Sequence, residues 1–184
     1  MKRLFFLSFF TIPFLSCNNY TPKVKEVITE SNQTLPEPRG VLNDFEEILQ
    51  YPEQGSDYSY FEKFSILDST LIEFQNRTGN EIAIITIADI KPYTTLKDYA
   101  IAIGNQWGIG KKKENNGLLM AISVARKEIW IATGNGTEKI ITDSICQDII
   151  QQQMLPEFKK GKVFKGIQNG LTTIINIWSE HSQP

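Results

Sequence analysis

The sequence contains few of the residues that enzymes most often use for catalysis. Among its 184 residues are one histidine, His181, close to the C-terminus, and two cysteines, Cys17 and Cys146. A Ser-His-Asp triad inside the fold is therefore not expected, and a zinc site of histidine and cysteine lacks its ligands. No Gly-Lys-Ser/Thr follows a glycine-rich segment, which excludes a phosphate-binding loop of the Walker type.

The chain also lacks a strong excess of charge of either sign. It has 19 Lys and Arg against 21 Asp and Glu, a formal net charge of −2, and its one basic run is residues 111–113, all lysines. Such a short run is typical of a solvated loop, so no nucleic-acid partner is expected. An apolar content of 41% and a charged content of 22% are typical of one globular domain with an extension.

A mostly apolar stretch lies at the N-terminus and is too short to span a bilayer as a mature helix. Lys2 and Arg3 precede the apolar residues 4–14, and Ser16 and Cys17 follow them. This order is typical of a bacterial lipoprotein signal, in which Cys17 becomes the first residue and receives acyl chains such as palmitate. We therefore predict a signal peptide at residues 1–16 and a lipid anchor at Cys17 on a membrane of the cell envelope. The alternative is a cleaved secretory signal with an incidental cysteine.

The rest of the chain divides into a tether and a domain. Residues 17–40 contain Pro22, Pro36 and Pro38 and few large apolar residues, which predicts a tether. Residues 41–180 are predicted to form a single globular domain. Within it Cys146 shares a helical apolar spacing with Ile149 and is expected to be buried and unreactive.

Apolar periodicity predicts a mixed β-sheet between helices. Strands are expected at residues 82–88, 118–124 and 129–133, and the last two form an antiparallel hairpin. Helices are expected from about residues 59 to 79, 95 to 108, 142 to 160 and 164 to 179. The first should bury Phe61, Phe64, Leu67, Leu71 and Phe74. The order strand, helix, strand predicts a βαβ unit with a right-handed crossover. We therefore predict a single α/β domain in which helices cover both faces of the sheet, in α-β-α layers.

Side chains rich in oxygen flank the predicted hairpin. Asn115 and Asn116 precede its first strand, and Glu138 and Asp143 follow its second. A hairpin brings the start of one strand beside the end of the other, so these four residues should converge. Carboxylate and amide oxygens are ligands that Ca²⁺ prefers. The structural alternatives are that Asp143 caps a helix and that Asn116 belongs to a turn.

The order of six short motifs resembles the TPM domain family, which is found in bacterial envelope proteins and in thylakoid proteins. The motifs are Asn43-Asp44, Thr78-Gly79-Asn80-Glu81-Ile82, Trp107-Gly108-Ile109-Gly110, Asn116-Gly117, Gly134-Asn135-Gly136-Thr137-Glu138 and Thr142-Asp143. The resemblance covers roughly residues 41–178. It implies a mixed sheet between helices, calcium binding, acid phosphatase activity in some members, and association with assembly or repair of membrane complexes.

The resemblance also implies a metal site. It places the acidic site of the family at Asp44, Asn115, Glu138 and Asp143, with Asn116 beside it. The family usually has Asp-Asn-Gly where this chain has Asn115-Asn116-Gly117. The function expected first is a membrane-tethered interaction or assembly module that binds Ca²⁺ and contacts membrane-protein complexes of the envelope. The alternatives are a metal-assisted acid phosphatase, with its catalytic residues unassigned, and an envelope module without metal.

Overall fold

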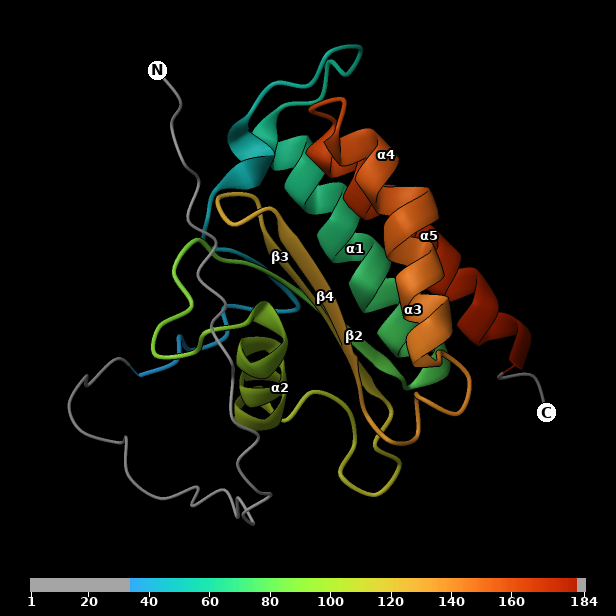
Figure 1. Cartoon of the computed structure of the whole chain (residues 1–184). Coiled ribbons are helices and arrows are strands. Elements are labelled where there is room, and N and C mark those ends of the chain that lie inside the picture. Colours follow the sequence, from blue (N-terminus) through green and yellow to red (C-terminus); the bar gives the residue numbers. More distant parts are fainter. Residues whose placement is uncertain (1–33, 182–184) are drawn as a thin grey trace, which may run out of the picture. The chain divides into compact units, whose positions relative to one another are not determined.

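A computed structural model describes residues 34–181 of the chain (Figure 1). The predicted signal peptide, Cys17 and most of the predicted tether lie outside these residues. The helices of the described part are all too short or too polar to cross a membrane. In chain order the elements are β1 (Leu42–Asp44), the short helix η1 (Ile48–Gln50), α1 (Tyr60–Thr78), β2 (Glu81–Thr86), α2 (Leu96–Trp107), β3 (Gly117–Ser123), β4 (Glu128–Thr133), α3 (Asp143–Ile149), the π-helical turn η2 (Ile150–Met154), α4 (Leu155–Phe158) and α5 (Val163–His181).

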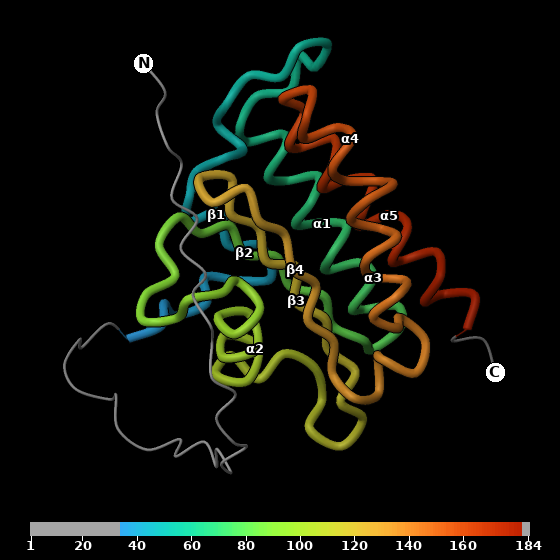
Figure 2. Tube along the Cα trace, viewed as in Figure 1, coloured from blue at the N-terminus to red at the C-terminus, as the bar shows by residue number. Residues whose placement is uncertain are grey.

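The strands form one mixed sheet in the order β1-β2-β3-β4 (Figure 2). β1, β2 and β3 are parallel, and β4 is antiparallel to β3. Ile84 of β2 lies opposite Met120 of β3, which lies opposite Ile131 of β4. The predicted hairpin and mixed sheet are thereby confirmed. β1 was not predicted, because three residues are too few to show a strand periodicity.

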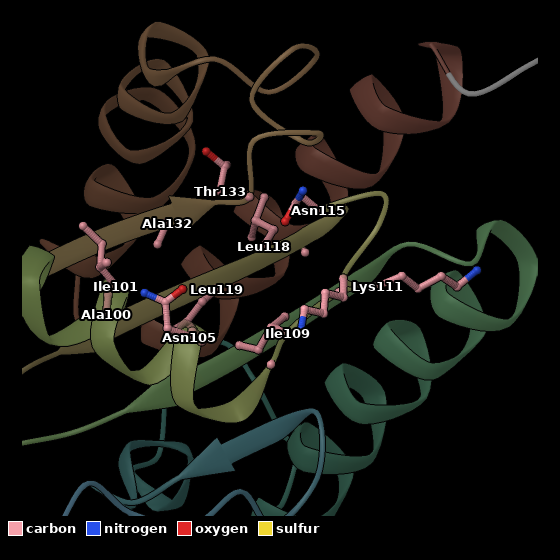
Figure 3. A pocket seen from close by; sticks show the side chains of 16 residues that line it. Ala100, Ile101, Asn105, Ile109, Lys111, Asn115, Leu118, Leu119, Ala132 and Thr133 are labelled. Carbon is pink, nitrogen blue, oxygen red and sulfur yellow. The ribbon is translucent and has the colours of Figure 1, made fainter.

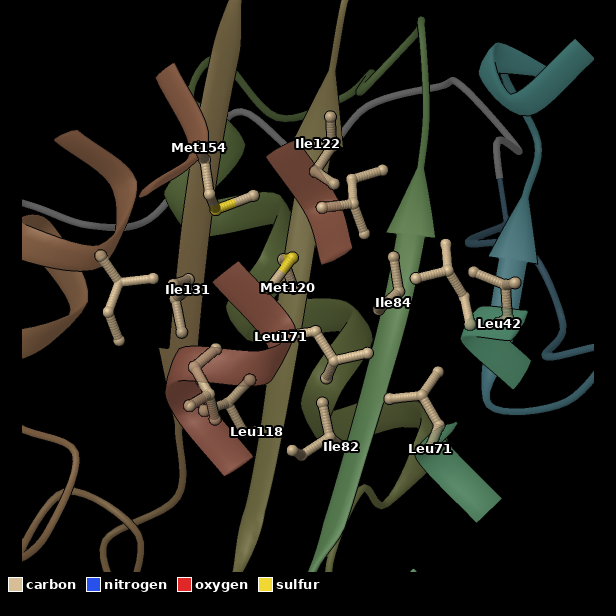
Figure 4. Close-up of a cluster of buried hydrophobic side chains, with 14 of the residues drawn as sticks. Leu42, Leu71, Ile82, Ile84, Leu118, Met120, Ile122, Ile131, Met154 and Leu171 are labelled. Carbon is tan, nitrogen blue, oxygen red and sulfur yellow. The ribbon is translucent and has the colours of Figure 1, made fainter. Parts of the chain in front are cut away.

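Helices cover both faces of the sheet, as predicted. α1, α3 and α5 pack on one face around Leu71, Ile84, Met120 and Leu171 (Figure 4). α2 packs on the other face around Ile85 and Leu119. Because side chains of a strand alternate between faces and both faces are covered, all seven residues of β3 are buried. This explains why residues 118–122 form a continuous apolar run.

Local chemistry fixes the ends of α1 and α2. Ser59 and Glu62 form a capping box at the start of α1, and Gly79 ends it with φ of 71°. Thr95 caps α2 by accepting a hydrogen bond from the Asp98 N–H. Both helices therefore begin and end where the sequence predicts.

The last residues of the predicted tether contact the domain. The indole Nε1 of Trp107 donates a hydrogen bond of 2.7 Å to the Pro36 carbonyl oxygen. The Arg39 guanidinium lies 4.6 Å from the centre of the Phe45 ring. Residues 36–39 therefore contact residues of the predicted domain.

Candidate functional site

The start of β3 and the end of β4 meet in a compact set of loops, residues 108–117 and 134–138, which we call the loop cluster. The Gly134 N–H donates to the Gly117 carbonyl oxygen at 2.9 Å. The N–H groups of Gly136 and Thr137 both donate to the Asn115 carbonyl oxygen, at 3.0 and 3.3 Å. Thr137 Oγ1 donates to the Gly117 oxygen as well, at 2.9 Å. These bonds hold residues 134–138 against residues 115–117.

Close backbone contact explains the glycines of the loop cluster. A Cβ on Gly117 would lie 2.1 Å from the Ile109 carbonyl oxygen, and one on Gly136 would lie 2.0 Å from the Glu114 carbonyl oxygen. A Cβ on Gly134 would lie 2.3 Å from the Asn115 oxygen. Any other residue type would collide with backbone at these three positions. The glycine motifs in this chain thus have a structural role.

Asn116 is also used for structure. Its Oδ1 accepts a hydrogen bond from the Lys111 N–H at 2.8 Å. Its Nδ2 donates to the Gly79 carbonyl oxygen at 3.0 Å and to Asn80 Oδ1 at 2.9 Å. The side chain thereby joins the end of α1 to the loop cluster. Its oxygen points to a backbone donor, so the predicted role of Asn116 as a metal ligand does not fit this geometry.

The loop cluster brings Asn115 beside the segment that carries Glu138, and Asp143 follows at the first turn of α3. All three side chains are exposed, and Asn115 has φ of 48°. Thr142, rather than Asp143, caps α3, because its side chain accepts from the Ile145 N–H. Asp143 is the first residue of that helix, and its carboxylate remains available for another partner.

Cys146 lies close enough to Asp143 and Glu138 for their carboxylate charges to act on its thiol. Burial raises the pKa of its thiol most, and the charges of Asp143 and then Glu138 add to the rise, to about 11. The thiol is buried and stays protonated near neutral pH, so it does not supply a nucleophile. The predicted burial of Cys146 is confirmed.

Asp44 lies at the other end of the sheet. It ends β1 opposite Thr86, whereas Gly117 begins β3 opposite Glu81. Thr86 is five residues beyond Glu81, which at about 3.3 Å per residue amounts to roughly 17 Å. One ion cannot bridge that distance, so the prediction that Asp44 joins Asn115, Glu138 and Asp143 is wrong.

Asp44 instead holds the turn that follows β1. Its Oδ1 accepts hydrogen bonds from Thr86 Oγ1 at 2.6 Å and from the Ile48 N–H at 3.0 Å. Its Oδ2 accepts from the Leu49 N–H at 3.2 Å. The residue is 7% exposed. These three donors satisfy the carboxylate and fix the start of η1 against β2.

The described residues 34–181 contain no group of three or more His, Cys, Asp and Glu side chains that is close enough to hold a metal ion. Without Asp44 and Asn116, the predicted set is reduced to the carboxylates of Glu138 and Asp143 and the amide of Asn115. Ca²⁺ takes six to eight oxygen ligands. The three remaining side chains do not complete such a coordination shell by themselves.

A pocket of about 440 Å³ lies beside the loop cluster, between α2 and the strands β3 and β4 (Figure 3). Its apolar lining includes Ile109, Leu119 and Ala132, and Lys111 and Asn115 also line it. Gly104 of α2 lines it too, and a Cβ there would meet nothing within 4 Å. Sequence reasoning missed this pocket, although a glycine in the middle of a helix was an available signal, because it destabilises the helix.

A second feature lies near the start of α1. Tyr51, Tyr58 and Phe61 are 67%, 51% and 79% exposed, and we call them the aromatic surface. The prediction that Phe61 is buried is therefore wrong. Lys63 is buried instead, at 1% exposed, and its Nζ donates to the Tyr51 carbonyl oxygen at 2.7 Å.

Buried polar groups hold the loop that carries Tyr51 and Tyr58 of the aromatic surface, whereas Phe61 stands on α1. The Glu53 carboxylate accepts hydrogen bonds from the N–H groups of Phe164 and Lys165 at the start of α5. The Tyr58 ring packs edge-on against the Phe164 ring with centroids 5.9 Å apart. An anchored loop thus keeps large apolar side chains in water.

Comparison with solved structures shows the same fold in bacterial proteins. The N-terminal domain of a protein from P. gingivalis is 22% identical, with a TM-score of 0.64 over 77% of this chain and 83% of that one. The BA42 protein from Bizionia argentinensis is 16% identical, with a TM-score of 0.58 over 70% of this chain and 86% of that one. At these identities the likeness shows the fold alone.

Comparison of the sequence with known proteins gives the family. A search of curated proteins found no match. A family model described as the TPM domain matches residues 61–177, which is more than half of the chain. With its α-β-α layers, its mixed sheet and this match, the chain belongs to the TPM domain family.

Proposed function

We propose that this chain is an interaction module of the cell envelope, held on a membrane by a lipid at Cys17. The carrying observation is the aromatic surface, in which Phe61 is 79% exposed. Large aromatic side chains in water are unfavourable for an isolated domain and are enriched in protein interfaces. Phe61 stands on α1, and the loop that carries Tyr51 and Tyr58 is anchored by Glu53, so a partner would find these side chains already in place.

The proposal is tested with a photo-crosslinking amino acid at position 61 in intact cells. It should capture one envelope protein, because the exposed ring of Phe61 would be covered by the partner. The capture should depend on Cys17, since the lipid holds the module beside that partner.

The second candidate is a metal-assisted acid phosphatase, and the observation in its favour is the pocket beside the loop cluster, lined by Lys111 and Lys112. Lysine side chains at a pocket suit a phosphate group. The side chains best able to act as nucleophile or base are engaged elsewhere. Cys146 is buried, and His181 lies at the end of α5 with its Nδ1 2.8 Å from the Ile177 oxygen. Hydrolysis of a phosphomonoester by the purified chain, lost on Asp143→Asn, would favour this candidate instead.

We further propose that Asn115, Glu138 and Asp143 bind Ca²⁺ weakly, with an affinity of about 10⁻⁴–10⁻³ M, the range of extracellular modules. Asn115→Asp adds a third carboxylate and should tighten binding, whereas Asp143→Asn should loosen it. Calcium binding to the folded state raises the melting temperature by mass action. The measurement is the melting temperature against millimolar CaCl₂ for wild type and both variants. A melting temperature that calcium leaves unchanged in all three proteins would refute the site.

A further inference from the structure

The strand β4 forms a free edge of the sheet over six residues. The Gly134 N–H bonds to Gly117 of β3, and bonds of an antiparallel pair involve every second residue. The backbone groups of the residues between therefore face away from the sheet. Those residues are Ile129, Ile131 and Thr133. Within residues 34–181, no hydrogen-bond partner is present for their outward N–H and C=O groups.

Three pockets follow this free edge, and together we call them the edge groove. One is the pocket beside the loop cluster. The second, of about 510 Å³, lies between α2 and Ile150 and is lined by Leu96, Trp130 and Leu155. The third, of about 550 Å³, lies at the hairpin turn and has walls of Val124, Ile129, Leu155, Phe158 and Val163. Figure 1 shows β4 with α2 on one side and α3 and α4 on the other.

The charged residues of the edge groove are mostly positive. Its lysines are Lys97, Lys112, Lys127 and Lys159, whereas the Lys111 ammonium lies beside Gly79 at the end of α1. Its acidic residue is Glu128, whose carboxylate lies 3.0 Å from the Arg126 guanidinium and also accepts from the Leu96 N–H. The protein as a whole has a formal net charge of −2. The free edge therefore carries positive charge that is not typical of the rest of the molecule.

We propose that the edge groove binds an extended, acidic segment of a partner protein, which adds a strand beside β4. This inference rests on the proposed role as an interaction module and names the chemistry of a partner. Backbone hydrogen bonds to Ile129, Ile131 and Thr133 supply affinity, and alternate side chains of the segment enter the pockets. Acidic side chains of the segment face the lysines. A second copy of this chain fits less well, because two lysine-lined grooves would face each other.

The test uses the full chain with Cys17→Ser, so that no lipid is attached, and a synthetic octapeptide of alternating glutamate and valine. The peptide should slow hydrogen exchange at the amides of Ile129, Ile131 and Thr133 at least tenfold at saturation. A matched peptide with lysine in place of glutamate should leave exchange unchanged. Lys127→Glu should weaken binding of the acidic peptide by about tenfold, because it turns an attractive charge into a repulsive one. The control Lys139→Glu changes an exposed lysine outside the groove and should leave the affinity unchanged.

Each other outcome overturns the proposal. Equal protection by the acidic and the lysine peptide would remove the role of charge. Protection that rises with protein concentration in the absence of peptide would assign the edge to a second copy. Binding of the acidic peptide without slower hydrogen exchange at these amides would refute the addition of a strand. An absence of protection at millimolar peptide would refute it as well. Crosslinking from position 61 does not involve β4, so failure here leaves the proposed function standing.

Discussion

Replacing Gly117 with alanine should lower the free energy of unfolding by about 3 kcal/mol or more, at the upper end of the cost of overpacking. The new Cβ would lie 2.1 Å from the Ile109 oxygen and 2.5 Å from its carbonyl carbon. Both atoms are backbone, so no side-chain rotation relieves the collision. Gly117 cannot move either, because β3 is paired with β2 on one side and β4 on the other.

The matched control is Gly104→Ala in α2. A Cβ there meets nothing within 4 Å, and alanine forms helix better than glycine, so this change should raise stability by about 0.5–1 kcal/mol. The free energy of unfolding of both variants is measured by urea denaturation, with circular dichroism as the signal. If Gly117→Ala were as stable as wild type, the close approach of residues 109 and 117 would be refuted, and with it the structural account of the glycine motifs.

Replacing Asp44 with alanine should lower the free energy of unfolding by about 3 kcal/mol. Its carboxylate satisfies three buried donors, namely the Thr86 hydroxyl and the N–H groups of Ile48 and Leu49. A hydrogen bond to a charged group contributes about 1.5–3 kcal/mol, and each buried donor left without a partner adds a penalty. Asp44→Asn keeps an acceptor and the side-chain shape, so it should lose less stability than the alanine variant.

The same variants separate this structural role from a role in metal binding. Asp44 lies at the opposite end of the sheet from Asn115, Glu138 and Asp143, so Asp44→Asn should leave the shift of melting temperature with calcium as in wild type. A variant of normal stability that no longer responds to calcium would instead make Asp44 a ligand.

Local signals in the sequence predicted the helices and the hairpin well. The Ser59 capping box, the Thr95 cap and the terminal glycines act within a few residues, so the sequence alone reveals them. The continuous apolar run of β3 likewise indicated a strand covered on both faces. These features explain why the sequence alone predicts the layers and the mixed sheet.

Features that depend on distant residues were not predictable. The position of Asp44 follows from β1 pairing parallel to β2, and β1 is too short to recognise. Helical periodicity places Phe61 on the same stripe as Phe64 and Leu67. It does not show whether the core extends to the first turn of α1. The free edge of β4 follows from the strand order, which the sequence does not specify.

Crosslinking from position 61 in intact cells tests the central claim most directly, that this TPM domain acts by binding a partner at a membrane. The account predicts one discrete adduct from position 61 and none from Glu73, which is exposed farther along α1. It also predicts that Cys17→Ser abolishes the adduct and releases the protein from the membrane fraction. Equal labelling from positions 61 and 73 would contradict it. So would a Cys17→Ser variant that still forms the adduct and stays in the membrane fraction.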